Sequence, residues 1–122
     1  MRALAPIALA PLAGCYTYQA YDGPPAKKDA VAIISADPRV NAGLPVVIAL
    51  RKVDDRVVGL AYDKLALEPG HHDLLVDCNV QASKSITRFP LSVEVEAGAR
   101  YRLVAELTPG NQECDTVRLE RR

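Results

Sequence analysis

The chain has 122 residues, with 15 basic and 15 acidic side chains and a formal net charge of zero. This length suits one small domain, and the charge balance argues against nucleic acid as a partner, because surfaces that bind phosphate backbones are strongly basic. There is no Trp and only one Phe, so the core must come mainly from aliphatic side chains, and the abundant, clustered valines favour strands.

The first 14 residues have the pattern of a secretory signal. One charge, Arg2, precedes a stretch from Ala3 to Gly14 that contains only Ala, Leu, Ile, Pro and Gly. A charged start, a short apolar run and small residues at its end are typical of such signals. A membrane-spanning helix needs about 20 apolar residues, and Pro6 and Pro11 disfavour a stable helix. We therefore predict that residues 1–14 are a signal peptide.

The sequence Leu12-Ala13-Gly14-Cys15 closes this run and resembles the lipobox of bacterial lipoproteins. The resemblance implies that the Cys15 thiol receives diacylglycerol, that the signal is cut before Cys15, and that the acyl chains anchor the protein stably. In that family an Asp after the cysteine often marks retention in the inner membrane. Tyr16 stands there instead, which favours the outer membrane, facing the periplasm. The alternative is a short buried helix with an incidental cysteine.

Residues 15–29 are predicted to form a lipidated tether. They contain Gly23-Pro24-Pro25 and show no apolar period, which is typical of a linker. Tyr16, Tyr18 and Tyr21 of this stretch could lie at the membrane interface, and the alternative is that they pack on the domain or stay solvated.

From residue 30 onward the pattern is that of short strands between turns. Strands are predicted over 30–35, 46–53, 57–62, 71–80, 86–98, 100–107 and 114–120, and residues 63–70 carry a strand into a Pro-Gly turn. Turn chemistry occupies 37–45, with Pro, Asn and Gly. Within 57–62, Gly59 suggests a bulge.

The clearest signals are strict alternations of apolar and polar residues. One face of 71–80 carries His72, Leu74, Val76, Cys78 and Val80. Phe89, Leu91, Val93 and Val95 face inward from the next strand, and Tyr101, Leu103, Ala105 and Leu107 from the one after. Pro90 places the first part of its strand at an edge or a bulge.

About seven such strands, and no long amphipathic helix, predict an all-β fold, a small antiparallel β-sandwich over residues 30–122. A small barrel is the competing architecture. Two stretches, "LALEPGHHDLLVDC" and "VEVEAGARYRLVAEL", also resemble small bacterial lipoproteins of uncharacterised family with PEGA-like sandwich domains. Within these two stretches of the chain, we expect Pro69-Gly70 and Ala97-Gly98 to make tight connections and Tyr101 to anchor a strand in the core.

If Cys15 is lipidated, Cys78 and Cys114 remain. An even pair in an exported chain predicts a disulfide. It would close a loop of about 37 residues, worth roughly 3.8 kcal/mol in the chain-entropy model. The alternatives are two separate buried thiols or a bond to another chain.

Few residues suggest chemistry. Neighbouring strand residues point to opposite faces, so His71 and His72 do not suit one metal ion, and the His71–Asp73 spacing gives only two ligands. We expect His72 to be half-buried and His71 solvated. Serines 83, 85 and 92 lack a nucleophile motif. Glu94 and Glu96 match a solvated strand face, and Asp54-Asp55 matches a turn rather than a calcium loop.

The sequence therefore predicts no catalytic residue, metal or cofactor. The expected function is that of a membrane-anchored periplasmic lipoprotein with a binding or scaffolding role in the cell envelope, acting on an envelope protein through a loop cluster or strand edge. The alternatives are a periplasmic inhibitor or ligand-binding module and, less favoured, an enzyme.

Overall fold

A computed structural model describes residues 16–36, 39–41, 44–59 and 61–122. The predicted signal peptide and Cys15 lie outside the described residues. Within the described part, the chain forms ten strands and one short 3-10 helix: β1 (Tyr16–Gln19), η1 (Lys28–Ala30), β2 (Ala32–Ser35), β3 (Arg39–Asn41), β4 (Leu44–Val53), β5 (Arg56–Val57), β6 (Tyr62–Leu67), β7 (Gly70–Val80), β8 (Ser85–Val95), β9 (Arg100–Leu107) and β10 (Cys114–Arg121).

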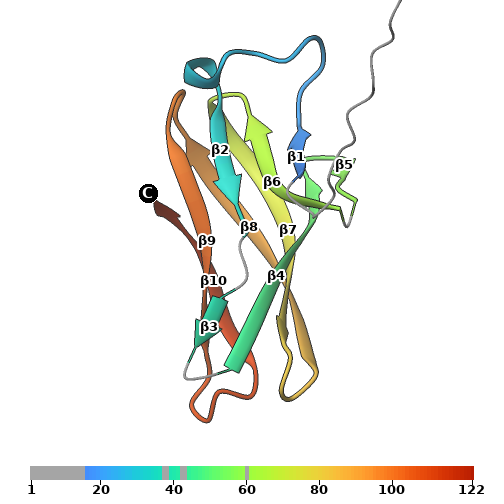
Figure 1. The fold of residues 1–122 in the computed structure, drawn as a ribbon, viewed down its shortest axis with the longest axis vertical. Helices are drawn as coiled ribbons and strands as arrows, with labels where there is room; N and C mark the ends of the chain where they lie inside the picture. Colours follow the sequence, from blue (N-terminus) through green and yellow to red (C-terminus); the bar gives the residue numbers. More distant parts are fainter. Residues whose placement is uncertain (1–15, 37–38, 42–43, 60) are drawn as a thin grey trace, which may run out of the picture.

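The strands form two sheets that pack face to face, so the predicted all-β sandwich is confirmed (Figure 1). The first sheet has the order β1-β6-β2-β9-β10. The second has the order β3-β4-β7-β8, with β5 added beside β4. Most neighbours are antiparallel, as predicted, but β1 runs parallel to β6 and β2 runs parallel to β9. These two pairings join segments far apart in the chain, which no local turn signal reveals.

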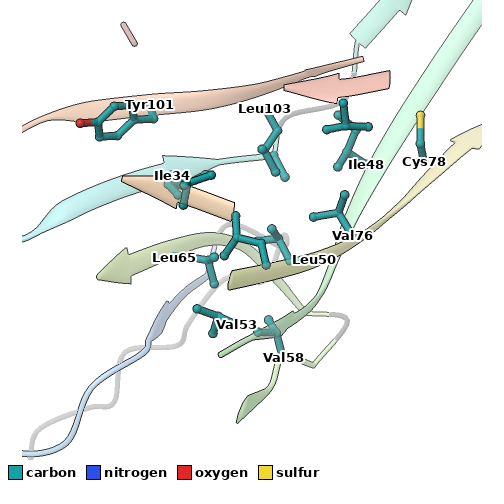
Figure 2. Close-up of a cluster of buried hydrophobic side chains, with 14 of the residues drawn as sticks. Ile34, Ile48, Leu50, Val53, Val58, Leu65, Val76, Cys78, Tyr101 and Leu103 are labelled. Atoms are coloured by element: carbon teal, nitrogen blue, oxygen red, sulfur yellow. The ribbon is translucent and has the colours of Figure 1, made fainter. Parts of the chain in front are cut away.

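The core lies between the sheets and is built almost entirely from aliphatic side chains. Figure 2 shows Ile34, Leu65 and Leu103 of the first sheet meeting Leu50 and Val76 of the second. Each of these five side chains is at most 2% exposed. Burying one such side chain fully stabilises a fold by about 1.5–3 kcal/mol, so this layer is the main source of stability.

The alternation predicted for β7 and β8 is confirmed. Leu74, Val76, Cys78 and Val80 are buried, whereas the residues between them are only partly buried. Pro90 lies in β8, which is an edge strand of the second sheet. Proline cannot donate a ladder hydrogen bond, and an edge strand tolerates it because only one side of that strand is paired.

The predicted tight connections and the anchor are also present. Gly70 and Gly98 have φ values of 122° and 79°, which glycine adopts without steric cost. Tyr101 is 6% exposed, and its hydroxyl accepts a hydrogen bond from the Glu96 backbone N–H at 3.0 Å.

The structure differs from the sequence prediction in the stretch 15–29. Residues 16–19 are not a free tether but form β1, the outer strand of the first sheet. The Tyr18 ring packs edge-on against Tyr62, with 5.2 Å between ring centroids, and Tyr21 is buried. Tyr18 and Tyr21 therefore pack on the domain, and this packing overrides the linker-like composition around Gly23.

Two smaller predictions are also wrong. Part of the predicted turn over 37–45 forms β3, which pairs with the first residues of β4. The predicted strand over 57–62 is not continuous: among its described residues only Val57, the last of β5, and Tyr62, the first of β6, lie in strands, and Gly59 lies in neither. The bulge of this region lies instead in β4, between Leu50 and Lys52. Extra backbone hydrogen bonds, such as Val58 N–H to the Arg51 carbonyl at 2.9 Å, hold the segment after β5 without a ladder.

Candidate functional site

A cluster of histidines and carboxylates occupies one end of the second sheet. Three elements supply it: the first residues of β7, the last residues of β8, and the turn that joins β4 to β5. The antiparallel register of β7 and β8 places His71 opposite Glu94 and Asp73 opposite Ser92. The Asp54-Asp55 turn approaches the same end from the other side of β7.

His71 lies between two carboxylates on the outer face of the sheet. Its Nδ1 is 3.0 Å from Glu94 Oε2, and its Nε2 is 3.1 Å from Asp73 Oδ1. Hydrogen bonds to Glu94 and then to Asp73 raise the pKa of the ring, because carboxylates only accept and so favour a proton on each nitrogen. His71 is 54% exposed, as expected for a solvated residue.

His72 points to the other side of the strand and is 12% exposed. Its Nδ1 is 2.8 Å from Asp54 Oδ2, and its Nε2 is 2.7 Å from the Glu68 carbonyl oxygen. The Asp54 carboxylate and the Glu68 carbonyl oxygen therefore hold the ring from both of its nitrogens. The expected half-buried position at the start of the strand is confirmed.

Asp54 connects the turn to β7. Its backbone N–H donates to the Asp73 carbonyl at 2.7 Å, and its Oδ1 accepts from the Asp73 N–H at 3.0 Å. Its φ of 54° lies in the left-handed region, which Asp tolerates better than most residues. Burial works to raise the pKa of Asp54, but hydrogen bonds from His72 and from the Asp73 backbone outweigh it and lower that pKa.

The cluster does not form a nucleophile site. Ser92 Oγ donates to Asp73 Oδ1 at 2.9 Å, whereas a serine nucleophile needs a ring nitrogen free to accept its proton. Both nitrogens of His71 already face carboxylates. The same arrangement does not suit a metal ion, because Asp73 and Glu94 lie at opposite sides of the ring and their oxygens do not converge on one point. Within the described residues, no group of three or more His, Cys, Asp or Glu could hold a metal.

A second polar group lies further along the outer face of the same sheet. Arg88 binds Asp77 with two contacts, Nε to Oδ1 at 2.8 Å and Nη2 to Oδ2 at 3.2 Å. Arg51 Nε lies 3.6 Å from Asp77 Oδ2. The hydrogen bond from Arg88 lowers the pKa of Asp77. Bidentate pairs of this kind fix geometry as well as charge.

Two shallow hollows lie on this face. Residues 51, 52, 57, 75 and 88 line one of about 150 Å³, and residues 79, 81, 84 and 86 line one of about 240 Å³. Both are smaller than the roughly 300–1,000 Å³ typical of small-molecule sites. They suit contact with a surface better than enclosure of a ligand.

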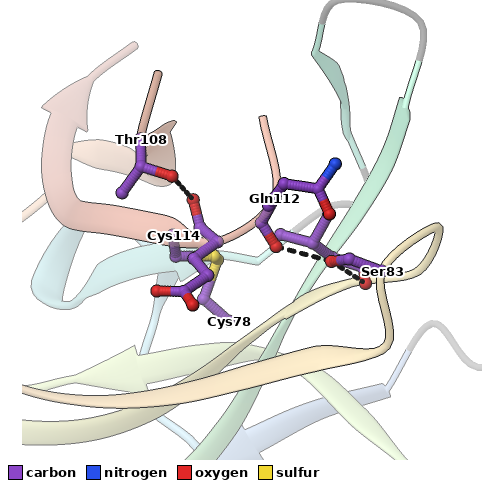
Figure 3. The surroundings of a disulfide bond; sticks show 7 residues. Cys78, Ser83, Thr108, Gln112 and Cys114 are labelled. Carbon is purple, nitrogen blue, oxygen red and sulfur yellow. Dashed lines mark hydrogen bonds between the residues drawn. A yellow bond between two sulfur atoms is a disulfide. The ribbon is translucent and has the colours of Figure 1, made fainter. Parts of the chain in front are cut away.

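At the far end of β7, Cys78 and Cys114 form a disulfide, as predicted (Figure 3). The bond joins β7 of the second sheet to β10 of the first, with 6.3 Å between Cα atoms. Both residues are buried. Beside the bond, the Ser83 hydroxyl donates to the Gln112 carbonyl, and Thr108 Oγ1 donates to the Glu113 carbonyl at 3.3 Å. The disulfide therefore closes the sandwich where the two long turns meet.

The other candidate residues named from the sequence do not lie together in one site. Ser83 lies in the turn beside the disulfide, whereas Ser85 is the first residue of β8. Glu96 binds Arg121, with Oε1 2.9 Å from Nη1, and so does not act together with Glu94. Cys15, the predicted lipidation site, lies outside the described residues.

The sequence reasoning missed the contacts between His71 and Glu94 and between Asp77 and Arg88. A signal for both exists in the turn over 81–84. Once Val80 is placed opposite Ser85, the antiparallel register sets every further pair of the hairpin.

No protein-family model, curated protein or solved structure matches this chain. Over the described residues, no helix is long and apolar enough to cross a membrane.

Proposed function

We propose that this chain is a lipid-anchored β-sandwich protein of the bacterial cell envelope that binds or scaffolds an envelope protein and has no catalytic role. The anchor is diacylglycerol on Cys15, after removal of residues 1–14. The domain then faces the periplasm from the outer membrane. The resemblance to small lipoproteins with PEGA-like domains supports this assignment, as does the lipobox-like sequence Leu12–Cys15.

The observation that carries the proposal is the pairing of the cysteines. Cys78 and Cys114 are bonded to each other inside the core, and the chain has three cysteines, so Cys15 is the one outside this bond. Structural disulfides form and persist in oxidising compartments. A bonded pair plus one cysteine after a short apolar run fits an exported lipoprotein.

The contacts of the polar cluster favour a structural role over a catalytic one. Its histidines are engaged by acceptors at both nitrogens, and Ser92 donates to a carboxylate rather than to a ring nitrogen. The His71 and Ser92 contacts hold β8 to β7, and the contacts of Asp54 with His72 and Asp73 hold the turn after β4 against β7; both are structural tasks. The alternative binding role is that of an inhibitor or ligand-binding module. It would use the same exposed loops on a soluble partner.

The intact mass of the protein from a native membrane fraction tests the proposal, measured before and after reduction with thiol alkylation. We expect the mass of residues 15–122 plus diacylglycerol, with two alkylated thiols appearing only after reduction. Replacing Cys15 by Ser should leave the disulfide intact and abolish the lipid mass. An unprocessed chain with three free thiols would refute the export and the anchor together.

Affinity capture after crosslinking in intact cells separates the two binding roles. Recovery of an envelope assembly protein supports scaffolding. Recovery of a soluble hydrolase supports the inhibitor role instead.

A further inference from the structure

The lipid anchor and the folded domain are separated by a single peptide bond. Tyr16, the residue after Cys15, is the first residue of β1 and pairs with Tyr62 of β6. Consecutive Cα atoms are about 3.8 Å apart, so acyl chains on Cys15 would start at the edge of the sandwich. We propose that this protein lies directly on the membrane and that the surface beside β1 and β5 binds anionic phospholipid headgroups. The inference rests on the proposed lipid anchor.

Figure 1 shows β5 on the same side of the sandwich as β1, and one contact ties β5 to the residues after β1. Arg56 of β5 binds Asp22, with Nη2 2.9 Å from Oδ1. The next residue, Val57, is 73% exposed. Among the described residues only Val57 and Ile86 are large apolar side chains with such exposure, and Val57 is the one near the anchor.

Val57 also lines the smaller hollow, together with Leu75 and the cations Arg51, Lys52 and Arg88. The acid within reach of this group is Asp77, which is 15% exposed and bound to both arginines. Three cations against one buried carboxylate leave an excess of positive charge.

Other carboxylates near this edge are already engaged, because Asp22 pairs with Arg56 and Asp54 pairs with His72. Asp55 is exposed in the turn before β5 and is the acidic side chain that still offsets part of the positive charge of the hollow.

A cationic hollow with an exposed apolar rim matches the chemistry of an anionic bilayer surface. Guanidinium and ammonium groups bind phosphate oxygens, and valine and leucine side chains enter the region below the headgroups. One Lys or Arg near such a surface changes association by about fivefold. Because the anchor already holds this edge at the bilayer, a few such contacts suffice to orient the domain.

Tryptophan fluorescence of the acylated protein in vesicles tests the orientation. The chain has no Trp, so Val57→Trp adds a unique reporter, and Ile86→Trp is the matched control because Ile86 is 63% exposed at the opposite end of the second sheet. The vesicles contain phosphatidylethanolamine, phosphatidylglycerol and a nitroxide-labelled phospholipid. We expect strong quenching and a blue shift for V57W and little of either for I86W.

Charge variants test the headgroup contact. Adding Lys52→Glu to V57W should remove most of the quenching, and so should replacing phosphatidylglycerol by a zwitterionic lipid. Lys84→Glu, which lines the other hollow, should change nothing.

Equal quenching of V57W and I86W, or no quenching of V57W, would overturn the proposed orientation. The lipid anchor is tested separately, by the lipid mass on Cys15. Quenching that ignores Lys52→Glu would overturn headgroup binding and favour a protein contact at this surface. Absence of the lipid mass would overturn the anchor, and this inference would fall with it.

Discussion

The two ends of β7 are fixed by different chemistry. Near its last residue, Cys78 is bonded covalently to β10 of the facing sheet. At its first residues, His71 and His72 are held to neighbouring segments by hydrogen bonds to carboxylates and a carbonyl oxygen. We expect the first end to respond to reductants, and the second end to respond to pH through the raised pKa of His71. One strand therefore carries two independent attachments, and each can be removed while the other stays.

The largest effect is expected from removing the covalent end. The double variant Cys78→Ala and Cys114→Ala should lower the free energy of unfolding by about 2–5 kcal/mol, because the unfolded chain loses its cross-link and small cavities open in the core. Urea denaturation checks this. The loss should be the same at mildly acidic and mildly alkaline pH, and a strongly pH-dependent loss would contradict the separation of the two ends.

A smaller effect is expected from Asp54→Ala at the polar end. The change removes the acceptor of His72 and of the Asp73 N–H and places Ala at a φ of 54°. We expect a loss of about 1–2 kcal/mol in the same denaturation assay. Asp55→Ala in the same turn is the matched control, and Asp54→Asn should lie between the two because Asn tolerates this backbone. If Asp55→Ala costs as much as Asp54→Ala, the contacts of Asp54 do not stabilise this end.

The smallest effect, visible only against pH, is expected from His71→Gln. The folded-state pKa of His71 is raised by Glu94 and then Asp73. Its stabilisation is therefore complete below the unfolded-state value of about 6.5 and is lost as pH rises through the folded-state pKa.

Melting temperatures measured across this range should show wild type above His71→Gln at acidic pH and the two converging at alkaline pH. Glu94→Gln should weaken the same pH dependence. A constant gap between wild type and His71→Gln would show that the ring acts by packing rather than by charge.

Local patterns in the sequence predict the parts of this fold that depend on near neighbours. Alternation identifies the buried face of β7, because Leu74, Val76 and Val80 repeat with the period of a strand. Counting cysteines finds the Cys78–Cys114 bond. Both signals depend on the chemistry of each residue and not on which segments meet.

What the sequence does not predict are contacts made between distant segments. Strand β1 is missed because its neighbours, Gly23 and the prolines after it, have the composition of a linker, whereas its stability comes from β6 and from the Tyr18–Tyr62 contact. The grouping of His72 with Asp54 is missed for the same reason, since it needs the turn after β4 to fold back on β7. Local propensity is a weak guide wherever tertiary pairing decides.

The parallel pairing of β1 with β6 also sets an order of assembly. β1 comes first in the chain, yet its partner is complete only after β2, β4 and β5 have been made. Residues 16–19 must therefore wait for β6 and join the sheet late. Once in place they cover the outer edge of β6, and an uncovered strand edge is a template for pairing with other chains. We expect that removing residues 16–19 would expose the edge of β6 and promote aggregation through it.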